Sequence, residues 1–180
     1  MDQVSEKDKL LTFCSSKGHC NLHNKTYEAC ASFLFYTSWF EELLFNDIHR
    51  QCAQKNEKIC QDLVVMIDIS KYDFLGNFLS DRYIVGENTS GKFHHLKLNN
   101  SQKEDVRNAL YLYKTNQTHD WKLLWAYLMV VYRFRNNMFH GNKGLVNINE
   151  YVDPFCLFND FLRLLIGDIL DNQYKGYNAR

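Results

Sequence analysis

The chain has little that would divide it into parts or place it in a membrane. One proline and eight glycines occur in 180 residues, and no segment is Gly/Ser-rich, of low complexity or repeated. We therefore expect a single domain over residues 1–180, in which residues 1–24 could form a loose extension. The longest apolar run, residues 123–132, is too short to span a bilayer, and the charged N-terminus does not resemble a signal peptide. These absences favour a cytoplasmic protein that makes no membrane contact.

Net charge and cysteine content also say little about the function of the protein. Twenty-one cationic side chains balance 21 acidic ones, so the overall charge does not indicate a polyanionic partner. Six cysteines are too few for a small secreted disulfide scaffold, and we expect reduced thiols, several of them buried. A cluster of potential metal ligands near the N-terminus lacks a CxxC pair: Cys14, His19, Cys20, His23 and Cys30. Incidental thiols are favoured over a zinc site there, and no metal or cofactor is expected.

What the chain has in quantity is apolar residues at helical spacing. Hydrophobic residues make up 46% and aromatic residues 15%, which is ample for a packed core. Their recurrence every three or four positions predicts an all-α protein, an up-and-down helical bundle of about five helices. The helices are expected over residues 26–54, 57–80 (with a break near 67–70), 101–114, 121–139 and from 154 onward. Residues 81–100 are expected to form a long loop or small excursion, and no strand ladder is expected.

Helix starts can be proposed from capping residues. Residues 101–104 have the pattern of a capping box, which would start the third of these helices. Thr118 or Asp120 would open the next one. Asp153 would cap the last helix, with Pro154 at its first position.

The distribution of charge is more informative than its sum. Residues 121–149 hold four cations and no carboxylate, and residues 88–103 hold three lysines, two histidines and no carboxylate. Within them, residues 133–143 (RFRNNMFHGNK) gather two arginines, three asparagines, a histidine and a lysine. Guanidinium groups match phosphate oxygens, and imidazole suits proton transfer near neutral pH. Such a set could cleave a phosphodiester without a metal ion.

Spacing alone does not choose the working arginine. Residues of a helix advance by about 100 degrees each, so Arg133 and His140 share a face with Asn136 between them. Arg135 lies roughly 140 degrees from His140 in that projection, but the helix can end before Gly141 and turn the histidine. A lone arginine and histidine at this spacing would more often be a solvated cation and a helix-end histidine. The additional asparagines and the trailing residues make this match longer than such a pair.

Residues 135–143 resemble the RNNLFHG(G/N)K form of the Arg-x4-6-His motif of the HEPN superfamily of ribonucleases, in a group of bacterial and phage proteins. Residues 81–83 and 93–100 resemble the middle segment of this group, and the likeness extends over residues 27–172. In the superfamily a polar residue, often asparagine, follows the arginine, which favours Arg135 over Arg133. HEPN toxins paired with nucleotidyltransferase antitoxins carry tyrosine two positions after the histidine, where this chain has Asn142, so that partner is not expected.

The resemblance implies a HEPN-like bundle that forms a homodimer with a shared active-site cleft. It implies a metal-independent endoribonuclease, of the toxin or abortive-infection type, that leaves a 2′,3′-cyclic phosphate. His140 would be the general base or acid, Arg135 would stabilise the phosphorane, and Asn136 would orient His140 or bind a phosphate oxygen. Further groups would bind RNA phosphates: Arg133, Asn137, Lys143, His95 and Lys97. RNA is the expected substrate, and an antitoxin or regulatory protein is a possible partner. The alternative is a catalytically silent HEPN-like module that binds RNA or protein.

Overall fold

The computed structural model describes residues 5–17, 22–44, 53–139, 145–172 and 174, and these residues are mostly helical. The all-α class is thereby confirmed. The α-helices are α1 Glu6–Lys17, α2 Asn24–Leu44, α3 Ala53–Leu63, α4 Asp73–Tyr83, α5 Gly91–His94, α6 Asn100–Asn116, α7 Trp121–Phe139 and α8 Val152–Asp171. The remaining elements are two 3-10 helices, η2 Ile69–Tyr72 and η3 Leu145–Tyr151, and two short strands, β1 Ile84–Val85 and β2 Asn88–Thr89.

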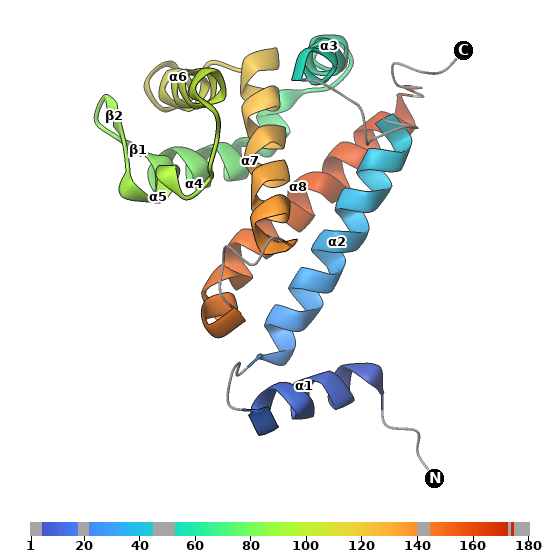
Figure 1. Ribbon diagram of the computed structural model, residues 1–180. Coiled ribbons are helices and arrows are strands. Elements are labelled where there is room, and N and C mark those ends of the chain that lie inside the picture. The colour runs from blue at the N-terminus through green and yellow to red at the C-terminus, as the bar shows by residue number, and fades with distance from the viewer. Residues whose placement is uncertain (1–4, 18–21, 45–52, 140–144, 173, 175–180) are drawn as a thin grey trace.

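The core is built around α7. Helices α2 and α8 lie side by side and the C-terminal half of α7 packs against both, while α3, α4 and α6 gather around its N-terminal half (Figure 1). Phe134 of α7 is 1% exposed, and its ring centroid lies 5.0 Å from that of Phe158 and 5.4 Å from that of Phe155, both on α8. Phe33 of α2 completes the cluster, 6.3 Å from Phe134. Edge-to-face packing of this kind fixes the rotation of α7 about its axis.

The described residues contain more helices than the expected five. Helix α2 covers residues 26–44 of the helix expected over residues 26–54, and residues 45–52 lie outside the described part of the chain. Helix α3 begins at Ala53, four residues before the start expected for the second helix, and packs against α7, whereas α2 packs against α8. The break expected near residues 67–70 is confirmed: α3 ends at Leu63, and Asp68 Oδ1 accepts a hydrogen bond of 3.0 Å from the Ser70 N–H at the start of η2.

Two expected helix starts are wrong. Asn99, not Ser101, caps α6: its side chain accepts from the Gln102 N–H, and the Gln102 side chain accepts from the Asn99 N–H. Tyr151 precedes α8 without a side-chain cap bond, so Pro154 is the third helical residue and Asp153 lies in the first turn. Proline is tolerated there because the first N–H groups of a helix have no acceptor within the helix.

Residues 84–89 form a small antiparallel hairpin where the sequence predicts no strand. Ile84 pairs with Thr89 and Val85 with Asn88, and Gly86 in the turn has a φ of +59°, the left-handed region that favours glycine. The predicted excursion also contains the single-turn helix α5. Its Phe93 is 2% exposed and packs 5.9 Å from the Tyr83 ring, which attaches the excursion to the end of α4.

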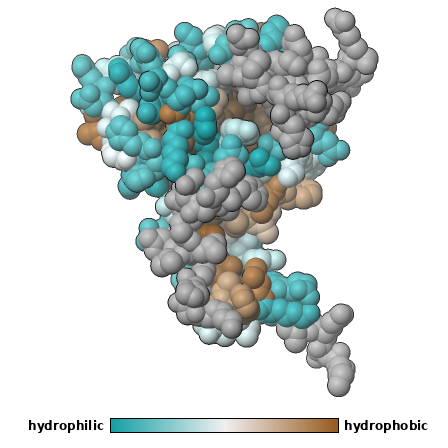
Figure 2. All heavy atoms as spheres, in the orientation of Figure 1, coloured by the Kyte–Doolittle hydropathy of each residue, from teal (hydrophilic) through white to brown (hydrophobic). Residues whose placement is uncertain are grey.

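Helix α1 extends away from the rest of the described chain (Figure 1). The ion pair between Lys7 and Glu28 of α2, 3.0 Å long, connects it to the body. Hydrophobic atoms are exposed on α1 (Figure 2), where Leu10 is 41% and Phe13 58% exposed. Among the described residues, no helix is both long and apolar enough to cross a membrane.

Candidate active site

The site is organised by helix α7, whose predicted bounds are confirmed. Asp120 Oδ1 accepts a 3.0 Å hydrogen bond from the Leu123 N–H, so Asp120 rather than Thr118 opens the helix. The first part of α7 is apolar and buried, and the last part carries four polar residues: Arg133, Arg135, Asn136 and Asn137. Phe134 is buried among them. Because Phe134 packs into the core, the side chains of Arg133 and Arg135 on either side of it extend from α7 in different directions.

Arg133 points toward the start of α6. Its Nη2 donates a 2.7 Å hydrogen bond to Gln102 Oε1, which also accepts from the Asn99 N–H at 3.2 Å. Arg133 Nε is buried and has no hydrogen-bond partner among the described residues. The same glutamine that closes the capping box of α6 thus holds a side chain of the motif.

Arg135 points toward α2. Its Nη2 lies 3.3 Å from Glu41 Oε2, and the whole Glu41 residue is only 9% exposed. A carboxylate in such a place requires a cation or several donors. Glu41 is absent from the site predicted by sequence, although a signal was present. It falls on the buried stripe of α2, next to Phe40 and four residues after Thr37, where an acid is out of place without a partner.

Asn137 joins the motif to the middle segment. Its Nδ2 donates a 2.9 Å hydrogen bond to the backbone oxygen of His95, and Asn137 is 5% exposed. Two predicted site residues, 42 positions apart, are thereby brought together. The buried amide of Asn137 serves this contact, while the His95 residue is exposed at the surface beside it.

The other predicted residues divide into exposed, half-buried and undescribed ones. Lys97 is exposed and has a φ of +52°, unusual for a residue with a side chain. Asn136 is half-buried, and its side chain forms no hydrogen bond to another described residue. His140 and Lys143 lie outside the described residues. The described part of the site is therefore the arginine and asparagine end of α7 with the turn after α5.

The middle segment is firmly docked. Tyr83 is 3% exposed, and burial raises the pKa of its phenol. The Ser90 hydroxyl donates to the Arg82 backbone oxygen at 2.7 Å, and Lys114 of α6 lies 3.0 Å from Asp81. These contacts connect residues 81–83 to the hairpin and to α6, so the turn that holds His95 has a rigid support.

Metal ligands do not gather in the described ranges: no group of three or more His, Cys, Asp or Glu side chains is placed to hold an ion. His19 and Cys20 of the N-terminal cluster lie outside these ranges. The described cysteines are free thiols, and burial raises the pKa of Cys60, which is fully buried. They are Cys14, Cys30, Cys60 and Cys156.

Comparison with known proteins gives no matching family model, no similar curated protein and no similar solved structure. Membership of the HEPN superfamily therefore stays a prediction from the motif at residues 135–143.

Proposed function

We propose that this protein is a metal-independent endoribonuclease of the HEPN type, acting as a toxin or abortive-infection effector in the cytoplasm. The observation that carries the proposal is the pairing of Arg135 with the buried Glu41, because it holds a guanidinium at the polar end of α7. Charge stabilisation by a preorganised donor is worth more than the same contact made by a mobile side chain. The anchoring of Asn137 on His95 supports the proposal by adding a second histidine-bearing segment.

In the proposed reaction, a base removes the proton from a 2′-hydroxyl of RNA. The 2′-oxygen attacks the adjacent phosphorus, the bond from phosphorus to the 5′-oxygen breaks, and an acid protonates that leaving oxygen. The products are a 2′,3′-cyclic phosphate and a 5′-hydroxyl. His140 supplies the base or the acid, Arg135 stabilises the charge on the phosphorane, and Asn136 orients His140 or binds a phosphate oxygen.

One motif supplies one histidine, whereas the reaction needs both a base and an acid. A homodimer with a shared cleft would supply both groups, with the like charges of the two motifs offset by the bound RNA phosphate. If one arginine and one histidine from opposite chains suffice, co-expressed Arg135→Ala and His140→Ala chains should recover some cleavage in the purified heterodimer relative to either mutant homodimer. A wild-type protein that sediments as a monomer while cleaving at full rate would contradict the shared cleft.

A second candidate function is an HEPN-like module that binds RNA or a partner protein, such as an antitoxin, without turnover. One observation favours it. Glu41 offsets the charge of Arg135, and a guanidinium so paired has less positive potential to offer a phosphorane.

The two candidates are separated by incubating the purified protein with total RNA in EDTA and mapping the ends of any fragments. The proposed enzyme yields 2′,3′-cyclic phosphate and 5′-hydroxyl ends under chelation. Activity that is lost in EDTA and restored by magnesium would contradict the metal-independent mechanism. RNA that is bound but stays intact would support the second candidate.

A further inference from the structure

Residues of α6, of the start of α7 and of α3 line a groove of about 550 Å³. These elements gather at the N-terminal end of α7, opposite the end that carries the arginines (Figure 1). Aromatic and polar side chains line its wall, among them Asp105, Arg107, Tyr111, Asp120, Trp121 and Trp125. Tyr111 and Trp121 are half-buried, whereas Trp125 is 4% exposed. The volume is within the range of small-molecule sites, about 300–1,000 Å³.

We propose that this groove binds a nucleobase of the RNA strand, an inference that rests on the proposed ribonuclease function. Partly exposed aromatic rings offer flat faces on which any base can stack. Two half-buried rings, Tyr111 of α6 and Trp121 of α7, line the same groove from different helices. The ligand that suits them is planar and aromatic.

The polar groups of the groove add a hydrogen-bonding pattern. Trp125 Nε1 and Arg107 Nε are buried donors without a hydrogen-bond partner among the described residues, and both residues line the groove. Buried donors of this kind are rare, and an adjustment of the two side chains at the groove wall would let both donate to a bound base. The Asp105 carboxylate is exposed and can accept from an amino or imino group. Ring nitrogens, carbonyl oxygens and amino groups on one flat molecule are what a base provides.

The charge of the groove argues against a phosphate as its main ligand. Its lining carries three carboxylates and two cations: Glu57, Asp105, Asp120, Arg107 and Lys122. A slightly negative wall repels phosphate and accepts an uncharged ring. The strand would then place its base here and its phosphates outside, toward the cationic end of α7. Trp125 and Arg133 are eight residues apart, about 12 Å along the helix.

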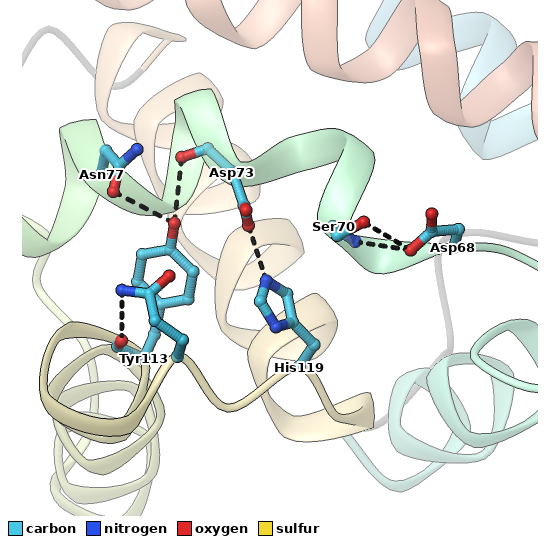
Figure 3. A network of polar contacts seen from close by, with 7 residues as sticks. Asp68, Ser70, Asp73, Asn77, Tyr113 and His119 are labelled. Atoms are coloured by element: carbon cyan, nitrogen blue, oxygen red, sulfur yellow. Dashed lines mark hydrogen bonds and ion pairs between the residues drawn. The ribbon is translucent and has the colours of Figure 1, made fainter.

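A polar network holds the α6–α7 loop that closes one end of the groove (Figure 3). His119 Nε2 lies 2.6 Å from Asp73 Oδ1, and the ring of His119 packs edge-on against Tyr113, with centroids 5.6 Å apart. The Gln117 N–H donates to the Tyr113 backbone oxygen at 2.9 Å. Thr118 and Asp120, on either side of His119, line the groove. The groove is therefore held in shape without its ligand, which lowers the entropy cost of binding.

The test measures RNA binding rather than cleavage, in a His140→Ala background. Trp39→Phe removes the one tryptophan of three that lies on α2, so that the remaining fluorescence comes from Trp121 and Trp125. A single-stranded RNA hexamer should quench this fluorescence saturably, while the same hexamer without bases should not. Equal quenching by the baseless hexamer would overturn the base site. So would a result in which adenosine or uridine quenches the fluorescence but the hexamer does not.

Variants locate the site by anisotropy of the labelled hexamer. Trp121→Ala and Tyr111→Ala should each weaken binding by about 5- to 150-fold, whereas Trp121→Phe keeps a stacking face and should stay near the wild type. His119→Ala should weaken binding while every groove side chain is kept. Unchanged affinity in both alanine variants would remove the groove from RNA binding. Because His140 is absent throughout, a failure of this site is distinguishable from a failure of the proposed catalysis.

Discussion

Arg135 on α7 and Glu41 on α2 form an ion pair, with Nη2 3.3 Å from Oε2. Arg133, two residues earlier on the same helix, instead donates to the neutral Gln102 side chain of α6. The two arginines of the motif therefore differ in their surroundings, one held by a buried carboxylate and the other by an amide. Their roles should differ accordingly.

We expect Arg135→Ala to cost more activity than Arg133→Ala. By analogy with the loss of one preorganised donor at an oxyanion, Arg135→Ala should lower RNA cleavage by roughly 10²–10³-fold. Initial rates of fragment formation on one RNA substrate give the comparison. Arg163→Ala is a suitable surface control, since Arg163 is exposed and bonds only to Asp160 one turn away among the described residues.

Glu41→Gln sharpens this ranking because it keeps the shape of the side chain and removes its charge. If Glu41 positions Arg135, the variant should cleave more slowly while binding RNA at least as tightly, as one negative charge is gone. A larger loss in Arg133→Ala than in Arg135→Ala would instead make Arg133 the working cation.

Asn137 should matter for stability more than Asn136. Asn137→Ala removes the donor that serves the His95 backbone oxygen at a buried position, which should cost about 1–3 kcal/mol in the free energy of unfolding. Asn136→Ala, at a half-buried position, should cost less than about 1 kcal/mol. Urea denaturation of both variants measures the difference. Equal stabilities would show that the contact between α7 and the turn after α5 is weak in solution.

Gly76 of α4 and Gly167 of α8 should respond in opposite ways to alanine. A Cβ at position 76 would overlap the Tyr127 hydroxyl and lie 2.6 Å from Tyr113 Cζ, so Gly76→Ala should destabilise the protein by about 1–3 kcal/mol. A Cβ at position 167 has nothing within 4 Å, so Gly167→Ala should stabilise α8 by up to about 1 kcal/mol. Thermal melts of the pair test the close packing of α4 on α6 and α7. A neutral Gly76→Ala variant would contradict that packing.

Alkaline pH should unfold the protein through its buried tyrosines. Burial, and then the charge of Asp73, raise the pKa of Tyr113 to about 12, and burial raises the pKa of Tyr127 as well. In an unfolded chain the pKa of tyrosine is about 10. Between about pH 10 and pH 12 the folded state therefore binds more protons than the unfolded state, so the free energy of unfolding falls as the pH rises through this range. Denaturant midpoints at about pH 9 and about pH 11, on either side of the unfolded pKa, measure the loss. Tyr113→Phe should reduce it, and an unreduced loss would exclude Tyr113 as a contributor.

Strongly patterned parts of the fold are predictable from the sequence, and contacts across the fold are not. The bounds of α7 follow from its apolar spacing and from Asp120, both local signals. Asn99 is hard to recognise as a cap because residues 101–104 offer a competing pattern, and the reciprocal hydrogen bonds between Asn99 and Gln102 show which one is used. The polar residues of α7 are recognisable as a candidate site. Glu41 is recognisable as an acid on an apolar stripe, but its partner Arg135 can be identified only once α2 and α7 are known to meet.

The most direct test of the central claim is cleavage of RNA by wild-type and His140→Ala protein in EDTA, with the fragment ends identified. The account predicts fragments with 2′,3′-cyclic phosphate and 5′-hydroxyl ends for the wild type, and none for a variant whose circular-dichroism melt is unchanged. The reason is that His140 is the one residue among 133–143 of a type that exchanges protons near neutral pH. Undiminished cleavage by the folded His140→Ala protein would contradict the proposed mechanism.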